Sequence, residues 1–517
     1  VDFDLHSEAG LANWQRFLDE AADLVVKYGG TLSGEHGDGE ARGALLEKMY
    51  GADLMAAQRE FRAIWDPRQR MNPGKVLDPY PITANLRVGP SYQPQQVKGV
   101  FDYPEDGSFT KATLRCVGVG KCRHRDPKGA VMCPSYLGTN EEKHSTRGRA
   151  RLLFEMLRGD SLIDGFASDE VEDALDLCLA CKGCKKDCPV QVDMATYKSE
   201  FRSRYFEKKR RPRAAYTMGQ IQRWAWLAST QPRLANIGTR VPLFSNVTKL
   251  AGGLSQHRRM PAFSSPPYRT WHRRRDKLNA GGERVLLWPD TFNNYFRSKT
   301  AIAATQVLER LGYQVDIPKR VLCCGRPLYD WGWIDQAKGL WRQTMRTLQQ
   351  DIEAGTPIIG LEPACVSAFR DELPALFPNE PLAKKLSQQT RLLSEFLVDR
   401  DLTLPVSGEV PSSLMVQFHC HHHAVLEKSK EQQLLDTLPL KANVLQEGCC
   451  GMAGSFGFEA EKYDLSMKIG ERIFRHIRAA SPETAIIADG FSCREQIEQG
   501  TGRKTLHLAQ LLEQATR

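Results

Sequence analysis

Fourteen cysteines lie in tight groups along the chain, and one group has a spacing suited to redox chemistry. Cys178, Cys181, Cys184 and Cys188 are separated by two, two and three residues, and a proline follows the last one. This spacing lets three thiolates bind one iron–sulfur cluster while the fourth reaches across to a second cluster. The run therefore predicts a complete 4Fe–4S cluster and a second cluster-binding motif elsewhere in the chain.

The expected second motif lies upstream of this run. Cys116, Cys122 and Cys133 are separated by five and ten residues, and the last of them again precedes a proline. Val119 stands where such a motif would carry a further cysteine. Cysteines two residues apart also fit tetrahedral zinc, but the Cys-Pro ending of both motifs favours iron–sulfur clusters.

The crossing of the fourth cysteine divides these seven residues between two sites. The complete 4Fe–4S cluster takes Cys178, Cys181, Cys184 and Cys133. The other site takes Cys116, Cys122 and Cys188. Three thiolates beside an apolar residue suit a 3Fe–4S cluster, or a second 4Fe–4S cluster completed by a ligand other than cysteine.

Two further groups each contain adjacent cysteines followed by glycine. Adjacent thiols are poor disulfide partners because the bond needs a specific geometry, but they can bind different irons of one cluster. The second group is the fuller one, with Cys420, Cys449, Cys450 and Cys493. The first group has Cys323, Cys324 and Cys365, and Asp290 stands at the place of a fourth cysteine. We expect any additional cluster in the second group; a zinc site or a reduced thiol pair is the alternative for both.

The elements that must position these groups indicate an α+β protein with several domains, because 517 residues exceed what one core supports. Residues 110–200 indicate short helices. Residues 201–280 are expected to begin as a helix and then to be broken by prolines and glycines. Residues 284–288, 298–311 and 313–315 indicate strand, helix and strand, and this rhythm recurs from about residue 413. Two copies of one α/β domain are therefore predicted.

The paired α/β copies resemble the cysteine-rich CCG domains of heterodisulfide reductase and of the iron–sulfur subunits of glycolate, lactate and anaerobic glycerol-3-phosphate dehydrogenases. In heterodisulfide reductase a fuller set of cysteines, ending in C-x2-C, holds a noncubane cluster. Glu362 and Gly490 replace the first cysteine of that final pair here. A thiol redox subunit of the heterodisulfide reductase type is therefore an alternative function, and a zinc-organised binding protein is a second one.

The N-terminal stretch Gly34-Glu35-His36-Gly37, together with Asn72-Pro73-Gly74-Lys75, resembles the C-terminal end of the FAD-linked oxidase family. The order of this tail, the α-helical ferredoxin-like motifs and two CCG copies resembles the C-terminal half of fused bacterial D-2-hydroxyacid dehydrogenases. The resemblance implies that Glu35 binds a divalent metal and that His36 removes the hydroxyl proton of the substrate. It also implies cofactor-binding positions at Asn72 and Lys75.

The expected domains follow this order. They are the oxidase tail with a linker (1–95), a ferredoxin-like domain (96–200), a basic connecting segment (201–280), the first CCG domain (281–405) and the second CCG domain (406–517). The FAD-binding half is expected before Val1, because the chain starts without Met and resembles only the second half of the family.

The resemblance implies FAD-dependent oxidation of a D-2-hydroxyacid, with D-2-hydroxyglutarate favoured over D-lactate, glycolate and D-malate. Clusters would then pass single electrons to a quinone, a cytochrome or an electron-transfer flavoprotein. The protein would hold and shield these cofactors, which supply the redox chemistry. The sequence leaves open whether the protein forms a homo-oligomer.

The net charge of +9 is unevenly distributed. Residues 201–277 hold 18 Lys and Arg against Glu207 and Asp276. This basic segment suits docking to an acidic part of the same assembly first, an anionic membrane second and nucleic acid last. A large chain without a signal sequence argues against a secreted disulfide framework. We therefore expect a cytoplasmic protein, with peripheral contact at the inner membrane surface left open.

Overall fold

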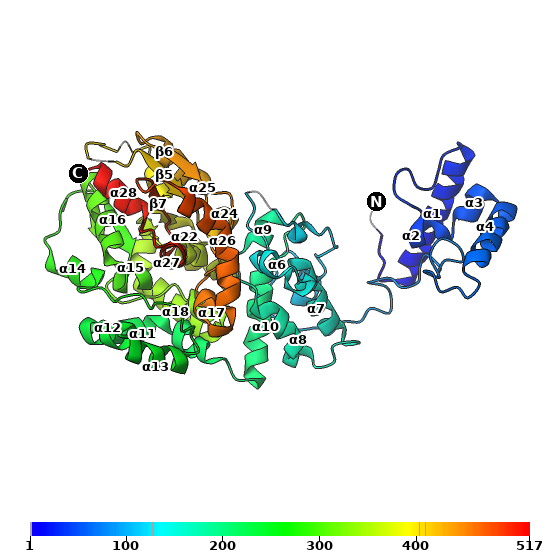
Figure 1. Ribbon diagram of the computed structural model, residues 1–517, viewed down its shortest axis with the longest axis horizontal. Coiled ribbons are helices and arrows are strands. Elements are labelled where there is room, and N and C mark those ends of the chain that lie inside the picture. Colours follow the sequence, from blue (N-terminus) through cyan, green and yellow to red (C-terminus); the bar gives the residue numbers. More distant parts are fainter. Residues whose placement is uncertain (1–2, 127–128, 403, 409) are drawn as a thin grey trace. The chain divides into compact units, whose positions relative to one another are not determined.

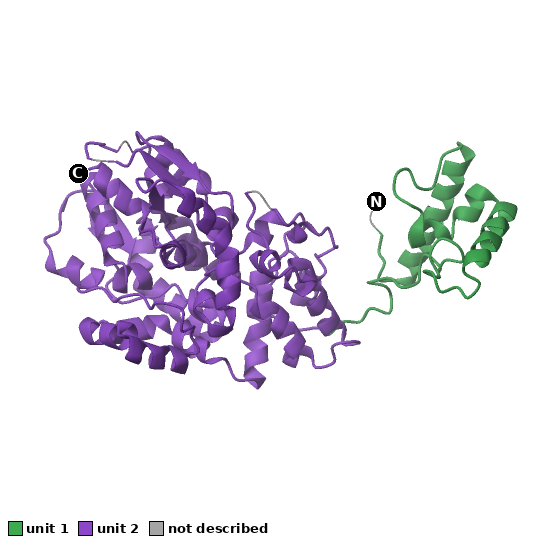
Figure 2. Cartoon of the chain, in the orientation of Figure 1, with its two compact units in different colours: residues 1–95 green, residues 96–517 purple. Residues whose placement is uncertain are grey.

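The computed structural model describes residues 3–126, 129–402, 404–408 and 410–517, which belong to two compact units, residues 1–95 and 96–517 (Figures 1 and 2). The described part of the first unit consists of helices and loops. Ser7 starts its first helix by accepting a hydrogen bond from Gly10 N at 3.1 Å, as an N-cap does. The helices are α1 (Glu8–Lys27), α2 (Gly39–Gly43), α3 (Leu46–Tyr50) and α4 (Ala52–Trp65).

A bundle of short helices opens the second unit (Figure 1). Serines cap two of them: Ser145 Oγ accepts from Gly148 N at 3.0 Å, and Ser168 Oγ accepts from Val171 N at 3.3 Å. Aromatic side chains such as Phe109 and Phe201 form its core. The helices are α5 (Phe109–Thr113), α6 (Pro134–Thr139), α7 (Thr146–Arg158), α8 (Asp169–Asp176), α9 (Gly183–Asp187) and α10 (Met194–Lys208), with 3₁₀ turns η1 (Lys121–Arg123), η2 (Glu142–His144) and η3 (Gly165–Ala167).

Prolines divide the basic segment into several helices. Pro232 and Pro242 each occupy the first turn of a helix, where the missing N–H has no partner to lose. The structure agrees with the expectation that prolines break this segment, because one helix ends at Ala228 before Pro232 and the next ends at Arg240 before Pro242. The segment contains η4 (Ala215–Gly219), α11 (Ile221–Ala228), α12 (Pro232–Arg240), α13 (Pro242–Gly252) and α14 (Tyr268–Arg274).

The first α/β domain is built on a parallel sheet with the strand order β2-β1-β3-β4. Val285 pairs with Val315, and Leu287 pairs with Ile359. The strands are β1 (Arg284–Trp288), β2 (Gln314–Asp316), β3 (Ile358–Gly360) and β4 (Thr390–Leu392). The helices are α15 (Thr291–Tyr295), α16 (Ser298–Arg310), α17 (Arg326–Asp330), α18 (Ile334–Thr347), α19 (Gln349–Glu353), α20 (Pro363–Ser367), η5 (Ala368–Glu372), α21 (Leu373–Leu376), α22 (Pro381–Gln389) and α23 (Leu393–Asp399).

The second α/β domain repeats this topology, with a parallel sheet of order β6-β5-β7-β8. Leu414 pairs with Ala442 on one side and with Ala485 on the other. The strands are β5 (Ser413–Val416), β6 (Lys441–Val444), β7 (Ala485–Ile487) and β8 (Thr505–Leu506). The helices are α24 (Cys420–Ala424), α25 (Lys428–Asp436), η6 (Phe456–Phe458), η7 (Ala460–Lys462), α26 (Tyr463–Ala479), α27 (Phe491–Thr501) and α28 (Leu508–Ala515).

The two α/β domains pack on each other reciprocally. Helix α16, near the start of the first domain, contacts α28 at the end of the second (Figure 1). Helix α25, near the start of the second, contacts α23 at the end of the first. Apolar side chains of both sheets and of these helices share one buried core. Each domain thus presents equivalent helices to the other, and the pair forms one scaffold for the cysteine loops.

Candidate functional site: a buried cysteine centre

The cysteine run 178–188 is held in a tight backbone conformation. Ala180 and Lys182 have φ values of 48° and 57°, in the left-handed region that residues with a side chain seldom adopt. A Cβ on Gly183 would lie 2.8 Å from Met132 N, so only glycine fits there. Asp187 Oδ2 accepts from Met132 N at 3.1 Å. These contacts fix the run against the segment just before Cys133.

The first α/β domain holds this run through buried charges. Lys182, which is 1% exposed, pairs with Asp371 and lies 3.2 Å from Glu372. Arg326 pairs with the same Glu372 and donates to Ala180 O at 2.9 Å. Buried charges of this kind persist only when they are paired and hydrogen-bonded. The position of the run therefore depends on the first α/β domain.

The second α/β domain holds the same run from α24, which packs on α9. His423 Nε2 lies 2.6 Å from Asp187 Oδ1, and His421 Nε2 lies 3.2 Å from Ala180 O. Burial and the neighbouring Cys420 raise the pKa of Cys181. The run thus meets Cys420, the first cysteine of the fuller group.

The three-thiolate site has a cavity of its own. Cys116, Cys122 and Cys188 line a small cavity together with Val119 and Arg147. The structure therefore brings together the three cysteines that the crossing rule assigns to this site. An apolar side chain stands beside them.

Helix α7 directs its N-terminal N–H groups at two of the cysteine sulfurs. Thr146 N donates to Cys133 Sγ at 3.0 Å, and Arg147 N donates to Cys122 Sγ at 3.4 Å. A helix N-terminus favours negative charge, so both contacts suit thiolates. Contact with the Cys133 thiol lowers the pKa of Cys122 to about 6. Cys133 thus contacts Cys122 of its own motif, and its assignment to the complete cluster stays a prediction.

The four cysteines of the second α/β domain form a chain of contacts. Cys420 contacts Cys449, which contacts Cys450, which in turn contacts Cys493, and all four are buried. Contact with the Cys449 thiol and the charge of His419 lower the pKa of Cys420. Against the effect of burial, the Cys420 thiolate raises the pKa of His419 to about 9. This set of soft thiolate donors suits an iron–sulfur cluster.

The first α/β domain offers three cysteines and a capping aspartate. Cys324 contacts both Cys323 and Cys365. Contact between the adjacent pair, with burial, raises the pKa of Cys323. Asp290 Oδ1 accepts from the N–H groups of residues 292 and 293 at 2.9 and 3.0 Å, and so caps α15. The carboxylate at the place of the fourth cysteine is therefore occupied by the backbone.

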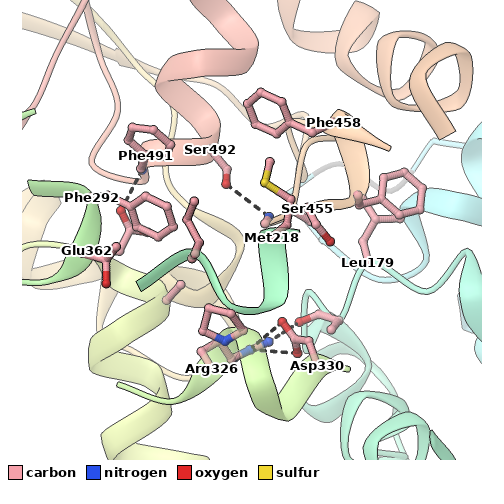
Figure 3. Close-up of a pocket in the computed structure, with 18 of the residues that line it drawn as sticks. Leu179, Met218, Phe292, Arg326, Asp330, Glu362, Ser455, Phe458, Phe491 and Ser492 are labelled. Carbon is pink, nitrogen blue, oxygen red and sulfur yellow. Dashed lines mark hydrogen bonds and ion pairs between the residues drawn. The ribbon is translucent and has the colours of Figure 1, made fainter. Parts of the chain in front are cut away.

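A cavity of about 180 Å³ lies between these groups (Figure 3). Its walls include thiols from the run and from both α/β domains: Cys178, Cys323, Cys324, Cys365 and Cys420. Glu362, whose pKa burial raises to about 7, spans the two domains because it accepts from Phe491 N at 2.8 Å. Phe292, Phe491 and Met218 supply apolar wall. Thiols of the cysteine run and of both α/β domains therefore line one cavity.

The residues expected at the substrate lie in the first unit, on an exposed loop. His36 Nε2 lies 3.3 Å from Glu35 Oε1, and these side chains are 79% and 89% exposed. Asn72 adopts a positive φ of 50° in its turn. Lys75 Nζ lies 2.5 Å from Glu40, in the helix that follows the Glu35-His36 loop. The two motifs of the oxidase tail are thus linked through Lys75.

Sequence reasoning missed the charged residues that hold the cysteine run. Lys182 lies inside the run and Arg326 directly follows Cys323-Cys324-Gly325, so their places in the motifs were a signal. Their partners were not visible, because Lys182 and Asp371 are 189 positions apart.

Comparison with known protein families accounts for most of this architecture. Residues 1–76 match the C-terminal domain of FAD linked oxidases, and residues 112–192 match a 4Fe-4S dicluster domain. Residues 291–370 and 420–498 each match the cysteine-rich CCG domain. With the two parallel sheets, these matches confirm the predicted fold class of an oxidase tail, a helical iron–sulfur domain and two α/β CCG domains.

Individual relatives agree with the family matches. The chain is 27% identical to the D-2-hydroxyglutarate dehydrogenase of Escherichia coli K12, over 96% of this chain and 53% of that protein. The corresponding enzyme of Pseudomonas putida is 29% identical, over 95% of this chain and 52% of that enzyme. A component of the anaerobic glycerol-3-phosphate dehydrogenase of Escherichia coli K12 is 30% identical, over 54% of this chain and 72% of that component. The chain thus spans about half the length of the D-2-hydroxyglutarate dehydrogenases that it matches.

Within the described residues, the structure contains no helix that is both long and apolar enough to cross a membrane.

Proposed function

The chain belongs to the family of iron–sulfur dehydrogenase proteins that includes the D-2-hydroxyglutarate dehydrogenases and this component of the anaerobic glycerol-3-phosphate dehydrogenase, and we propose that it is the electron-carrying part of an FAD-dependent D-2-hydroxyacid dehydrogenase. One observation carries the proposal. Cys178 of the cluster-type run lines the same buried cavity as thiols of both α/β domains. Such a centre can pass electrons between cofactors that the protein shields from water.

D-2-hydroxyglutarate is the proposed substrate, and 2-oxoglutarate the product. The support is the similarity to D-2-hydroxyglutarate dehydrogenases over 96% of this chain. Because the chain spans about half of such a relative, an FAD-binding half is the proposed partner. The flavin would accept the hydride of the substrate, and iron–sulfur clusters bound to this chain would carry the electrons onward singly.

Three groups of cysteines are the proposed cluster ligands. The complete 4Fe–4S cluster is assigned to Cys178, Cys181, Cys184 and Cys133. The second site of the dicluster domain, with a 3Fe–4S or a second 4Fe–4S cluster, is assigned to Cys116, Cys122 and Cys188. An additional cluster is assigned to Cys420, Cys449, Cys450 and Cys493. The shared cavity of the second set and the chain of thiol contacts in the third support the last two assignments; the first follows from the spacing of its cysteines.

The protein's own charges would tune this centre. Lys182 and Arg326 bring positive charge to the backbone of the run, and both are buried. The potential of a cluster depends on net charge, hydrogen bonds to sulfur and exposure to solvent. Helix α7 supplies hydrogen bonds of this kind to Cys122 and Cys133. The hydrogen bonds to sulfur would therefore favour the reduced clusters, whereas the charges of Lys182 and Arg326 are offset by Asp371 and Glu372.

Substrate chemistry is proposed for the oxidase tail. His36 would take the hydroxyl proton, and Glu35 would hold a divalent metal that acidifies this hydroxyl. The contact between the two side chains supports a joint role. Lys75 and Asn72 are proposed to face the FAD, on the loop linked to α2 by the Lys75–Glu40 pair.

A peripheral membrane contact is proposed for the basic segment, on the acceptor side of the centre. Large apolar side chains on α11–α13 are about half exposed or more: Trp224, Trp226, Leu227, Leu234, Ile237, Leu243, Phe244, Val247 and Leu250. Arg223, Arg233 and Arg240 lie among them, a pattern that suits an anionic lipid surface. Co-sedimentation with phosphatidylcholine vesicles should then require added phosphatidylglycerol, and Trp226→Ser with Phe244→Ser should weaken it. Equal sedimentation with both vesicle types would contradict the contact.

Anaerobic reduction of the protein with its FAD-binding half tests the main proposal. D-2-hydroxyglutarate should bleach the visible cluster absorbance faster than D-lactate, glycolate, D-malate or glycerol 3-phosphate. His36→Ala should slow this bleaching by roughly 10²–10⁴-fold, the contribution of a general base, and should leave reduction by dithionite unchanged. Clusters that dithionite reduces but no 2-hydroxyacid reduces would refute the proposed activity.

A further inference from the structure

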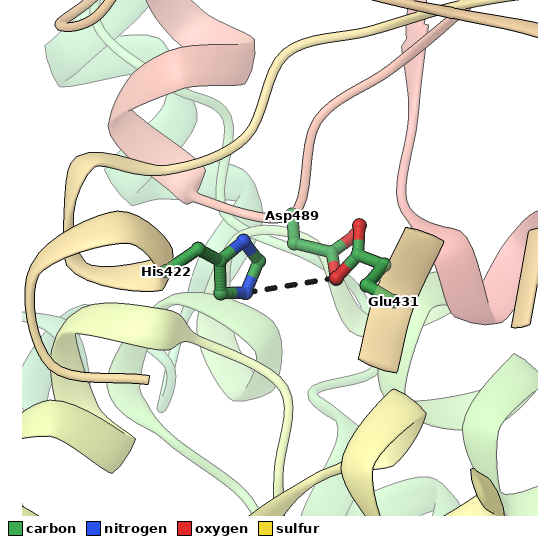
Figure 4. Close-up of side chains that lie close together, drawn as sticks. All are labelled: His422, Glu431 and Asp489. Atoms are coloured by element: carbon green, nitrogen blue, oxygen red, sulfur yellow. Dashed lines mark ion pairs between the residues drawn. The ribbon is translucent and has the colours of Figure 1, made fainter. Parts of the chain in front are cut away.

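Three side chains with metal-binding atoms converge in the second α/β domain, apart from its cysteines (Figure 4). His422 lies in α24, Glu431 lies in α25, and Asp489 follows β7. One ligand atom from each lies within 4.8 Å of the others. The three residues are 1%, 2% and 4% exposed. A histidine and two carboxylates are therefore gathered in the protein interior.

Some polar atoms of this group have no hydrogen-bond partner among the described residues. Within the part of the chain that the structure describes, neither ring nitrogen of His422 has a hydrogen-bond partner, nor does Glu431 Oε2. His422 Nε2 and Glu431 Oε2 are 3.6 Å apart, beyond hydrogen-bond distance, and point toward each other in Figure 4. Buried polar groups are nearly always hydrogen-bonded, because burying them unpaired costs free energy. A ligand between these atoms would remove that cost.

A proton shared by the two carboxyl groups is the simplest arrangement without a ligand. It would account for the contact between Glu431 and Asp489. It would still leave both nitrogens of the buried His422 unpaired. A cation between the three side chains would bind one nitrogen of His422 and a carboxylate oxygen from each of Glu431 and Asp489 at once, which a shared proton cannot do.

Neighbouring groups orient one of the carboxylates. Asp489 Oδ1 accepts from Leu508 N at 2.8 Å and lies 3.5 Å from His507 Nδ1. His507 is fixed in turn, because its Nε2 lies 2.8 Å from Leu361 O in the first α/β domain. Metal ligands are commonly held by outer contacts of this kind.

We propose that His422, Glu431 and Asp489 bind a divalent transition-metal ion, Zn²⁺ by preference. Zinc accepts imidazole nitrogen and carboxylate oxygen, with three protein ligands and a water in the fourth position. Magnesium and calcium prefer a full set of oxygen ligands. The group contains no thiol, so it does not suit an iron–sulfur cluster. Two carboxylates neutralise the double charge of the ion, which lowers the cost of burying it.

The site is placed to brace the fuller cysteine group. His422 is two residues after Cys420, and Asp489 is four residues before Cys493. A bound ion would therefore join both cysteine loops to α25. The matching positions of the first α/β domain, two residues after Asp290 and four before Cys365, are Phe292 and Leu361. They offer no ligand atoms, so the brace belongs to the second domain alone.

Metal analysis of the whole chain, expressed with zinc and purified anaerobically, tests this proposal independently of the proposed activity. We expect Glu431→Gln and Asp489→Asn, which keep the side-chain shape, to lose a zinc ion that the wild type retains. His476→Gln, a change at a half-exposed histidine outside the site, should retain it. Cys450→Ser should lower iron and leave zinc in place. Wild-type protein without zinc, or zinc lost equally from the His476 variant, would overturn the proposal.

Thermal unfolding supplies a second readout that does not depend on how well a variant accumulates. Removal of zinc from the wild type with EDTA should lower its Tm, and Zn²⁺ alone should restore it, because a ligand bound only by the folded state stabilises that state. Glu431→Gln should show neither change. A Tm that responds to EDTA equally in wild type and variant would place the metal elsewhere and refute this site.

Discussion

The two α/β domains share one topology and differ in what their loops carry. In both, the first strand lies inside a parallel sheet of the same order, and a Cys-Cys-Gly loop follows the second strand. The first domain places Asp290 after its first strand, and the second places Cys420 there. Chemistry therefore depends on a few loop positions, while the strand order is common to both.

The difference extends to the state of the thiols. In the second domain, contacts with neighbouring thiols lower the pKa values of Cys420 and Cys450. In the first, burial raises the pKa of Cys365 to about 12, although a hydrogen bond from Cys324 opposes it. The second domain thus holds two thiols with lowered pKa values beside Cys449 and Cys493, whose pKa values are raised by contact with neighbouring thiols and by burial, whereas the pKa values of all three thiols of the first domain are raised. We infer a division into a cluster-binding domain and a supporting domain.

The largest expected effect comes from matched cysteine changes. Cys450→Ser should remove the iron of the additional cluster and block electron transfer to the acceptor, because Cys450 contacts both Cys449 and Cys493. Cys324→Ser should change the iron content little. Iron and acid-labile sulfide in anaerobically purified protein measure both. Equal iron loss from the two variants would make Asp290 or Glu362 a ligand and would end the proposed division.

The next comparison concerns the way each domain holds the cysteine run. Lys182→Met removes a buried positive charge that pairs with the carboxylates of Asp371 and Glu372, and both carboxylates stay buried. We therefore expect the free energy of unfolding to fall by about 3–5 kcal/mol. His423→Gln removes a hydrogen bond to the Asp187 carboxylate and should cost about 1.5–3 kcal/mol.

Urea unfolding of the two variants decides between these anchors. Lys185→Met is the control, because Lys185 also pairs with Asp371 but has a side chain that is 41% exposed. A larger loss from His423→Gln than from Lys182→Met would mean that the second domain, and not the first, positions the run.

Much of this scaffold follows from local sequence pattern. The strand expected at 284–288 is β1, and the helix expected at 298–311 is α16, which ends one residue earlier. These elements are set by apolar periodicity, which is visible in any short window. The spacing of the cysteines likewise placed Cys116, Cys122 and Cys188 together, and these three line one cavity.

The contacts between distant segments could not be predicted in this way. Arg326 reaches Ala180 across 146 positions, and Glu362 reaches Phe491 across 129. Such pairs depend on how whole domains pack, which no local pattern records. The same holds for the group of His422, Glu431 and Asp489, because only the folded sheet brings its three segments together.

A smaller effect should come from the glycine that replaces the first cysteine of the expected final pair. A Cβ on Gly490 would lie 2.4 Å from His419 Cδ2, and this ring has little room to move because it is buried, with its Nδ1 3.1 Å from His421 N. Gly490→Ala should therefore destabilise the protein by about 1–3 kcal/mol, the usual cost of overpacking. Adding His419→Ser should recover the lost stability, because serine is smaller than histidine and can still cap α24. Thermal unfolding compares the three proteins, and an unaffected Gly490→Ala variant would show that the ring moves freely.

The smallest effect is expected at Asp290, and it tests whether this residue is a cap or a ligand. Its carboxylate accepts from Phe292 N, from Asn293 N and from Asn293 Nδ2 at 2.8 Å. Asp290→Ala should lower the free energy of unfolding by about 1 kcal/mol, the typical cost of a lost N-cap, and Asp290→Asn should lose less because the amide oxygen still accepts. Neither change should alter the iron content, since a carboxylate engaged with backbone N–H groups has little left to offer a soft metal site. Iron loss from both variants would instead identify Asp290 as a fourth ligand, because asparagine keeps the cap and lacks the carboxylate, and the first domain would then bind a cluster as well.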